Sequence, residues 1–183
     1  MDEQTQRASV EVLVEIPRGS RNKYEYDQRR KLFRLDRVLY AAVHYPTDYG
    51  FVVGTRAPDG DGLDALVVVE EPTFPGCLVP ARPIGALEMR DERGADQKLL
   101  TVPVGDPRFA EVLDLADLAS HWQREIEAFF ATYKVLQGIE TQVLGWHGAD
   151  EVWRLIAACQ RTGAAARRRR TRTPRRAADS GRT

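Results

Sequence analysis

The spacing of apolar residues changes once along this chain, and that change limits the folds open to it. Through the first two thirds, short runs rich in Val, Leu and Tyr are separated by clusters of Gly, Pro and Asp. Such runs are typical of strands joined by tight turns. From about residue 120 onward, apolar residues recur at helical spacing. The pattern predicts a mainly β fold with helices packed beside it, and it favours a small barrel over a parallel sheet.

The positions of the apolar runs predict where the strands and helices lie. Strands are predicted at 10–16, 23–27, 31–37, 64–70, 78–89, 97–102 and 139–146. Pro80 and Pro83 fall inside one of them, which is therefore expected to lie at an edge or to bend. One helix is predicted at 120–137, with Ser120 and Gln123 spaced for a capping box. A last helix would bury an apolar face made by Val152, Leu155, Ile156 and Cys159.

Charge divides the chain into two unlike parts. The 183 residues include 27 basic and 27 acidic side chains, so the formal net charge is zero. However, nine of the basic residues are arginines between Arg161 and Arg182, a segment whose single acidic residue is Asp179. With 43% hydrophobic residues, the chain can bury one core, and we expect a domain at 1–163 followed by a disordered, arginine-rich tail at 164–183. The tail could contact nucleic acid or another polyanion through charge, although it has no aromatic residue for base stacking.

Several kinds of protein are excluded by what the chain lacks. Its N-terminal residues are polar, and no window approaches the roughly 18 apolar residues of a membrane span, so we expect a cytoplasmic protein without a membrane contact. Cys77 and Cys159 are far apart and match no disulfide framework or thiolate zinc site. His44, His121 and His147 have no metal-ligand spacing, so structural or surface roles are expected for all three.

Two acidic clusters carry the strongest chemical signal. The first is the run 59–64, Asp-Gly-Asp-Gly-Leu-Asp, a glycine-rich turn that leads into an apolar segment. It is not an EF-hand loop, because Asp64 stands where that loop needs glycine. Asp and Gly are also common in ordinary turns, but a second cluster, made by Asp91, Glu92 and Asp96, flanks another turn. Hard carboxylate oxygens without His or Cys suit Mg²⁺, with Mn²⁺ as an alternative.

Cationic and phenolic side chains suited to an anion lie on both sides of these clusters in the sequence. Lys23 and Glu25, for example, alternate on one face of a predicted strand. Taken one at a time, such residues are more often surface charges or packed tyrosines than ligands. Only their combination is informative, and the candidate substrate-binding residues, which include one carboxylate, are Lys23, Glu25, Arg37, Tyr45, Tyr49, Lys98, Tyr133 and Lys134.

Six runs of the sequence together resemble the soluble family I inorganic pyrophosphatases. The runs are 15–27, 36–37, 45–50, 59–64, 91–98 and 133–134. They occur in that family's order, and the acidic run at 59–64 is its best-known signature. The resemblance implies an OB-like closed barrel of five strands flanked by two helices, which hydrolyses pyrophosphate to two phosphates with several Mg²⁺ ions per active site.

The resemblance also implies a role for each matching residue. Asp61 would take a proton from the attacking water, so that no covalent intermediate is needed. The metal ligands would be Asp59, Asp64, Asp91, Asp96 and, through water, Glu15. The phosphate under attack would be held by Lys23, Tyr49 and Lys98, and the leaving phosphate by Arg37, Tyr133 and Lys134. Two neighbouring divalent ions would lower the pKa of the attacking water toward neutrality.

The sequence departs from the family pattern in two places. Gly62 stands where the family commonly has proline, which predicts a freer loop and weaker preorganisation of the metal site. The arginine-rich tail is the other departure, since the family's chain normally ends near the last helix. Bacterial members are typically hexamers, so the resemblance implies a homo-oligomer.

Two other functions remain as alternatives. The chain could be an OB-type nucleic-acid-binding protein, although the field of its acidic body would repel phosphates. It could also be an inactive scaffold that keeps the pyrophosphatase fold. The scaffold is disfavoured because none of the expected acidic, lysine or tyrosine residues is replaced.

Overall fold

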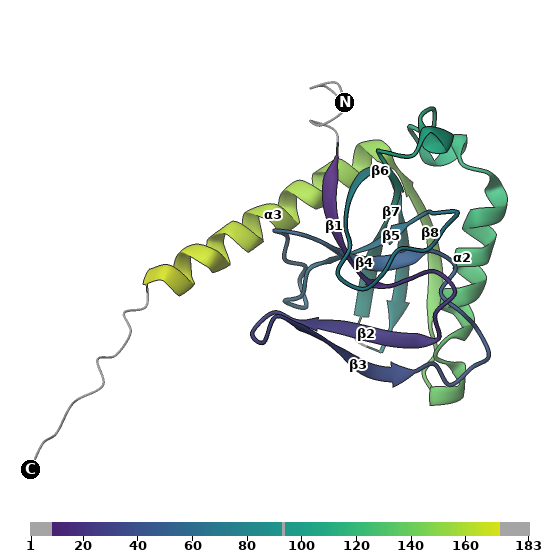
Figure 1. Ribbon diagram of the computed structural model, residues 1–183, viewed down its shortest axis with the longest axis horizontal. Coiled ribbons are helices and arrows are strands. Elements are labelled where there is room, and N and C mark those ends of the chain that lie inside the picture. The colour runs from purple at the N-terminus through teal and green to yellow at the C-terminus, as the bar shows by residue number, and fades with distance from the viewer. Residues whose placement is uncertain (1–8, 93, 173–183) are drawn as a thin grey trace, which may run out of the picture.

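Five strands close into a barrel, and a sixth extends the sheet. The computed structural model describes residues 9–92 and 94–172. The strands of the main sheet are β1 (Val10–Ile16), β4 (Asp48–Val52), β5 (Leu63–Val67), β6 (Leu78–Asp91), β7 (Gly94–Pro103) and β8 (Gln142–Gly148). They pair in the order β1-β4-β5-β7-β6-β8, and a further pairing of β1 with β6 closes the first five into a ring (Figure 1). β5 and β7 are parallel, and the other neighbours are antiparallel. The predicted five-stranded barrel is therefore confirmed.

Alternating side chains fill the barrel interior, as the period of a strand requires. In β1, Val12 and Ile16 are fully buried whereas Glu11 is exposed. β6 pairs with β1, β7 and β8, and its register shifts between Pro83 and Gly85. This strand bends, as its prolines predict, and it does not lie at an edge.

The sequence does not predict β4, because its residues mix an acidic side chain and a glycine with aromatic ones. Gly50 is required there, since a Cβ at this position would lie 2.0 Å from the carbonyl oxygen of Leu13 on β1. The two backbones can approach closely only with glycine at this point. That approach brings β4 into the ring, where Tyr49 is paired with Leu66 of β5.

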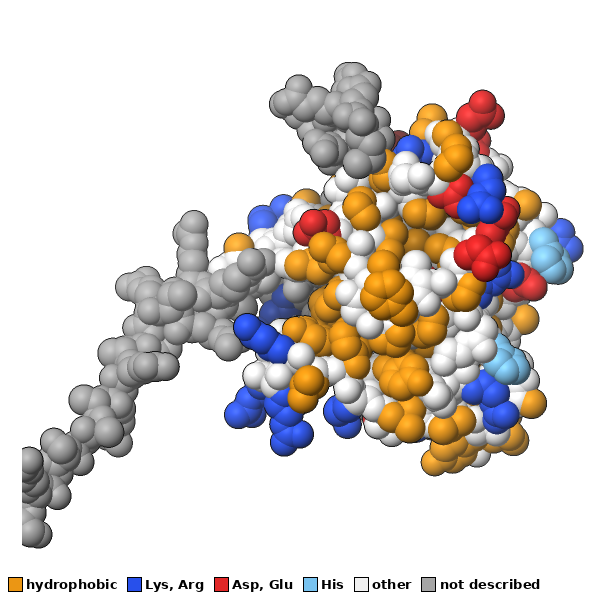
Figure 2. All heavy atoms as spheres, in the orientation of Figure 1, with side chains coloured by type: hydrophobic (Ala, Val, Ile, Leu, Met, Phe, Trp, Pro, Cys, Tyr) orange, Lys and Arg blue, Asp and Glu red, His pale blue; other side chains and the backbone are white. Residues whose placement is uncertain are grey.

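A separate hairpin lies against the barrel. It is made by β2 (Asn22–Asp27) and β3 (Leu32–Val38), which pair only with each other among the described strands. The turn at 28–31 exposes three basic side chains, and Lys and Arg side chains gather at that edge of the molecule in Figure 2. Tyr26 stacks on Phe51 of β4 with ring centroids 6.4 Å apart, so the hairpin is held to the barrel by side chains.

α2 (Ser120–Thr132) runs along the barrel in Figure 1. The short 3-10 helices η1 (Pro107–Phe109) and η2 (Leu115–Asp117) precede it. The predicted capping box at its start is wrong, because the Gln123 amide donates to the carbonyl oxygen of Leu115 at 3.3 Å. A capping box forms instead at η2, between Asp114 and Asp117. The buried face of α2 consists of Ile126, Phe129 and Phe130.

The helix predicted at 120–137 is divided into two elements. α2 ends at Thr132, and the 3-10 helix η3 (Val135–Gln137) follows it. Gly138 terminates η3 with a φ of +72°, a left-handed conformation that glycine adopts at little cost.

α3 (Ala149–Arg172) packs on the barrel through the predicted residues Val152, Ile156 and Cys159, all buried. Its C-terminal end projects away from the barrel in Figure 1. Residues 164–172 continue the helix, although the sequence predicts disorder from residue 164, because alanine and arginine are good helix formers even without apolar partners. The rest of the predicted tail, 173–183, lies outside the described residues. In the described ranges, no helix is both long enough and apolar enough to cross a membrane.

Candidate active site

A buried lysine bridges three strands of the barrel. Lys98 on β7 is 3% exposed, and its Nζ donates to Oδ2 of Asp64 at 2.7 Å and to Oδ2 of Asp96 at 2.9 Å. The hydroxyl of Tyr49 on β4 donates to Asp64 Oδ2 at 2.5 Å and accepts from Lys98 at 3.1 Å. Because β5 and β7 lie side by side in the sheet, the two acidic clusters of the sequence meet at this lysine.

Burial and charge set the protonation states in this cluster. Burial acts to lower the pKa of Lys98, but Asp64 and the other acidic groups around it outweigh burial and hold that pKa well above its ordinary value. Burial raises the pKa of Tyr49, and the Asp64 carboxylate adds to the effect. At neutral pH, Lys98 is therefore an ammonium and Tyr49 a neutral hydroxyl that donates its proton.

Aromatic side chains from α2, from its C-terminal end and from the segment before β4 pack around this cluster. The Tyr45 ring lies 5.5 Å from the ring of Tyr49 and 4.8 Å from that of Phe129. The Tyr133 ring lies 5.4 Å from that of Phe130. Burial raises the pKa of both Tyr45 and Tyr133, so both hydroxyls stay neutral at physiological pH.

A second polar cluster lies on the hairpin. The Lys23 ammonium donates to Glu25 at 2.6 Å and to Asp36 at 3.3 Å, so Lys23 and Glu25 share one face of β2 as predicted. Arg37 Nε donates to Oδ2 of the same Asp36 at 2.9 Å. Arg34 donates to the other oxygen of Glu25. Each carboxylate of this cluster therefore serves two cations.

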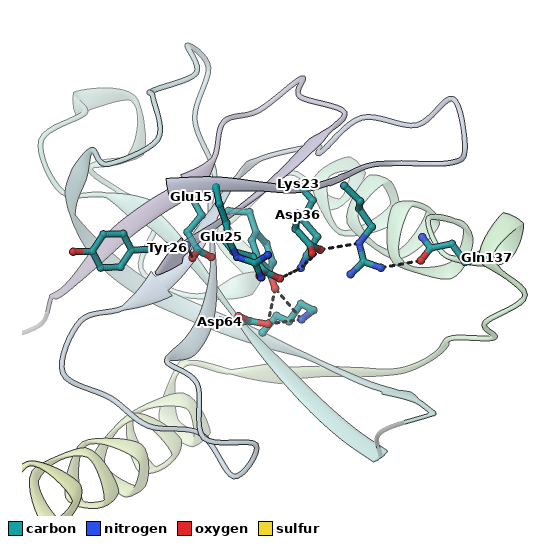
Figure 3. A network of polar contacts seen from close by, with 11 residues as sticks. Glu15, Lys23, Glu25, Tyr26, Asp36, Asp64 and Gln137 are labelled. Atoms are coloured by element: carbon teal, nitrogen blue, oxygen red, sulfur yellow. Dashed lines mark hydrogen bonds and ion pairs between the residues drawn. The ribbon is translucent and has the colours of Figure 1, made fainter. Parts of the chain in front are cut away.

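Glu15 on β1 connects the hairpin with the barrel. Its carboxylate accepts a hydrogen bond from the backbone N–H of Tyr26 at 2.7 Å. Burial raises the pKa of Glu15 to about 7, and the charges of Asp64 and Glu25 add to the increase. Figure 3 shows Glu15, Glu25 and Asp64 lying near one another where hairpin and barrel meet. The two clusters therefore belong to one site.

Lys134 adds another ammonium, from the segment between α2 and η3. Its Nζ lies 2.6 Å from Oδ2 of Asp91 and 3.9 Å from Glu92. The Asp91 side chain is only 7% exposed. Burial acts to lower the pKa of Lys134, but the hydrogen bond to Asp91 leads the effects that raise it above its ordinary value. The end of β6 is thus tied to the end of α2.

The acidic loop before β5 is the most exposed part of the site. Asp59 and Asp61 are both exposed, and the backbone N–H of Asp61 donates to Asp59 Oδ1 at 3.0 Å. Partial burial raises the pKa of Asp61, and the charges of Asp59 and Asp64 raise it further. Asp64, which follows this loop, is the carboxylate that Lys98 contacts at 2.7 Å, so the loop leads directly to the buried lysine.

The carboxylates of this site suit a hard divalent cation by their chemistry. Asp59 and Asp64 raise the pKa of Asp61, and Asp64 raises that of Glu15; a cation among the oxygens relieves such repulsion. Within the described ranges, no three His, Cys, Asp or Glu side chains form a ready metal-binding group. Instead, lysines hold oxygens of Asp64, Asp96 and Asp91. A bound cation would therefore compete with ammonium groups for these oxygens.

Gly62 has a packing role that the sequence does not reveal. A Cβ at this position would lie 2.6 Å from Cδ2 of Phe51. The Phe51 ring thus fills the space that a proline ring would need. The freer loop expected from Gly62 is accordingly limited by contact with an aromatic side chain.

Asp36 and Gln137 belong to the polar network of the site, although the sequence does not predict a role for either. Asp36 joins Lys23 to Arg37, and Gln137 accepts a hydrogen bond from Arg37 at 3.0 Å. The position of Asp36 beside Arg37 on a strand was an available signal, whereas Gln137 lies 100 residues from its partner. His147 contacts Glu88 and Glu151, neither of which is a predicted site residue.

Comparisons with known proteins agree with these features. The family model described as inorganic pyrophosphatase matches residues 12–163. The inorganic pyrophosphatase of Synechocystis is 51% identical over 150 residues, which cover 82% of this chain and 89% of the relative. That of Geobacillus stearothermophilus is 50% identical over 150 residues, with 82% and 91% covered. The crystal structure of inorganic pyrophosphatase from Thermus thermophilus matches with a TM-score of 0.84 and 40% identity over 90% of this chain and 95% of that chain.

The matched region includes the whole candidate site, from Glu15 to Lys134. The barrel, the acidic loop and the paired lysines therefore occur within the part of the chain that the family shares. The chain belongs to the family I inorganic pyrophosphatases.

Proposed function

We propose that this protein hydrolyses inorganic pyrophosphate to two phosphates, using several Mg²⁺ ions, with Mn²⁺ as an alternative metal. The observation that supports this best is the interleaving of carboxylates with ammonium groups, as in Lys98 between Asp64 and Asp96 and Lys134 beside Asp91. Carboxylates provide the oxygen ligands that hard divalent ions prefer, and ammonium groups bind phosphate oxygens. Membership of the family, over residues 12–163, supports the same activity.

The carboxylates of the site would share the work of holding the cations. In this proposal, the metal-binding residues are Asp59, Asp64, Asp91, Asp96 and, through water, Glu15. The bound ions would offset the charge of pyrophosphate and lower the pKa of the attacking water. Tyr49 and Lys98 keep Asp64 in place by hydrogen bonds, so this central carboxylate is oriented by the barrel itself.

Asp61 would be the general base. It is exposed on the acidic loop, where it can reach water, and the partial burial of its carboxyl group, together with the charges of Asp59 and Asp64, raises its pKa above the ordinary value. A base accepts a proton most effectively when its pKa lies near the working pH. The water would attack phosphorus directly as it loses this proton, so no covalent intermediate is needed.

The cations and hydroxyls would bind the two phosphates and stabilise the charge that develops during transfer. Lys23, Tyr49 and Lys98 would hold the phosphate under attack. Arg37, Tyr133 and Lys134 would hold the leaving phosphate. Glu25 would orient Lys23, which it contacts at 2.6 Å, and Tyr45 would orient Tyr49 through ring packing at 5.5 Å.

We also propose how the chain is organised. The catalytic domain would span 1–163, a boundary supported by the end of the family match at residue 163, with the arginine-rich segment 164–183 as an appendage. The enzyme would act in the cytoplasm as a homo-oligomer, a hexamer by analogy with bacterial members of the family. Binding of a polyanion to the appendage would be an additional activity, which catalysis would not need.

Phosphate release from pyrophosphate tests the function. Turnover should require Mg²⁺, and Asp61→Asn should lower it roughly 100- to 10,000-fold, the usual contribution of a general base. Asp150→Asn, at an exposed carboxylate on α3, is the matched control and should leave turnover unchanged. Turnover that is independent of metal, or equal loss in both variants, would contradict the proposal.

The alternative as a nucleic-acid-binding protein predicts a different result. It requires salt-dependent binding of nucleic acid to the barrel and no Mg²⁺-dependent phosphate release. The acidic character of residues 1–160 opposes such binding, because its field repels phosphates. An inactive scaffold would show neither activity.

A further inference from the structure

Gln137 contacts the one arginine assigned to substrate binding. Its side-chain oxygen Oε1 accepts a hydrogen bond from NH1 of Arg37 at 3.0 Å, and Figure 3 shows it at the far end of the polar network. The bond joins the 3-10 helix η3 to the hairpin strand β3. Gln137 is only partly exposed.

The two hydrogen bonds of Arg37 restrict an otherwise flexible group. The Arg37 side chain is 37% exposed, and a free arginine would lose substantial rotamer entropy on binding a ligand. Asp36 holds Nε at 2.9 Å while Gln137 holds NH1. An arginine has five N–H donors, so three remain available for phosphate oxygens. The guanidinium is thus oriented before a ligand arrives.

The neutrality of Gln137 matters as much as its geometry. Lys23, Lys98 and Lys134 are each paired with at least one carboxylate, whereas the second acceptor of Arg37 is an amide. Asp36 is already shared between Lys23 and Arg37. A second carboxylate at position 137 would offset the positive charge that an anion needs, while an amide orients the group and leaves its charge available.

We propose that Gln137 is a positioning residue that orients Arg37 toward a phosphate group of pyrophosphate without neutralising its charge. The inference rests on the proposed function, in which Arg37 binds the leaving phosphate. The chain position supports it, because Lys134 caps the N-terminal end of the one-turn helix η3 and Gln137 closes its C-terminal end. The backbone N–H of Gln137 donates to the Lys134 carbonyl at 2.8 Å. One short turn therefore carries both Lys134 and the acceptor that orients Arg37.

Two substitutions separate positioning from simple support. Gln137→Met removes the acceptor and keeps the length of the side chain, whereas Gln137→Glu keeps an acceptor and adds a negative charge. We expect Gln137→Met to raise KM for Mg²⁺-pyrophosphate roughly three- to tenfold, as for the loss of one ordinary hydrogen bond, with a smaller change in kcat. Gln137→Glu should raise KM at least as much, and the increase should shrink at high salt, which screens the added charge. Gln160→Met, at an exposed glutamine on α3, is the control.

A double-mutant cycle with Arg37→Met gives the decisive readout. If Gln137 acts through Arg37, then Gln137→Met should not raise KM further in the Arg37→Met background. The same cycle should hold for the dissociation constant of methylenediphosphonate, a non-hydrolysable analogue, measured by calorimetry with Mg²⁺. Melting temperatures of all variants should stay close to that of the wild type, because the bond is partly exposed.

Several results would overturn the inference while leaving the function intact. Additive effects of Gln137→Met and Arg37→Met on KM would show that Gln137 acts independently of Arg37. A Gln137→Glu variant with wild-type KM would show that only the hydrogen bond matters and that charge is irrelevant. By contrast, a wild-type protein that releases no phosphate would disprove the proposed function itself, and the analogue titration would then show whether Gln137 still affects binding of a diphosphonate.

Discussion

Two lysine clusters of similar composition occur in very different surroundings. On the barrel, Lys98 contacts Asp64 and Asp96 with only 4% of its side chain exposed. On the hairpin, Lys23 contacts Glu25 and Asp36 with 23% exposed. The first is held by strands that pair on both sides, whereas the second belongs to a two-stranded sheet held to the barrel by side chains.

The difference shows how one site can combine fixed and adaptable charges. A charge without water around it interacts strongly with its partners and depends on them for its stability. A charge near the surface is screened and can change partners at little cost. We therefore expect the barrel cluster to control stability and the hairpin cluster to control substrate affinity.

The largest effect is expected from Lys98→Met. This change removes a buried ammonium and leaves Asp64 and Asp96 facing each other, so the free energy of unfolding should fall by about 2–4 kcal/mol, somewhat less than for a fully buried pair, because both carboxylates are about one third exposed. Urea unfolding in the presence of a chelator measures it. The comparison between the clusters would fail if Lys98→Met proved no more destabilising than the same change at Lys23.

The next effect concerns Glu15, where the two regions meet. Its pKa is about 7 in the folded protein and about 4.5 ordinarily, so the folded state binds more protons than the unfolded state between these values. Stability therefore falls as pH rises from about 4.5 to 7. Removing this group with Glu15→Gln should flatten that slope, and at pH 8 the variant should be more stable by about 2–3 kcal/mol.

Chemical unfolding from pH 4.5 to 8 in chelator provides the check on Glu15. The difference between wild type and variant isolates this carboxyl from the other titrating groups. Curves that run parallel through this range would show that Glu15 titrates normally. A metal added at pH 8 should favour the wild type, because a cation stabilises the ionised carboxylate.

Much of the fold follows from local patterns in the sequence. Val12 and Ile16 on β1 alternate with polar residues, and Ile126, Phe129 and Phe130 recur at helical spacing, so these elements are predictable from their periods. β4 is not, because Gly50 is placed by its close approach to β1 rather than by any local preference. Apolar periodicity does not predict the continuation of α3 to Arg172, because the apolar residues stop earlier while the helix propensity of alanine and arginine persists.

The site, too, is predictable from the sequence only in part. The acidic and basic residues could be predicted as a group, because several runs of a known family occur in order. Their pairing could not, since Lys98 meets Asp64 only through the parallel register of β5 and β7. Contacts across long sequence separations, such as Arg37 with Gln137, have no local signature at all.

The smallest stability effect, and the sharpest contrast with Lys98, is expected at Lys23. Lys23→Met removes two ion pairs at 2.6 and 3.3 Å, yet Glu25 keeps Arg34 and Asp36 keeps Arg37 as partners. The free energy of unfolding should therefore change by less than about 1 kcal/mol, as for partly exposed pairs. KM for Mg²⁺-pyrophosphate should rise instead, because the variant loses an ammonium that binds phosphate. Urea unfolding and steady-state kinetics on the same preparation decide the matter: a large loss of stability with unchanged KM would mean that the hairpin cluster supports the fold in the way the barrel cluster does.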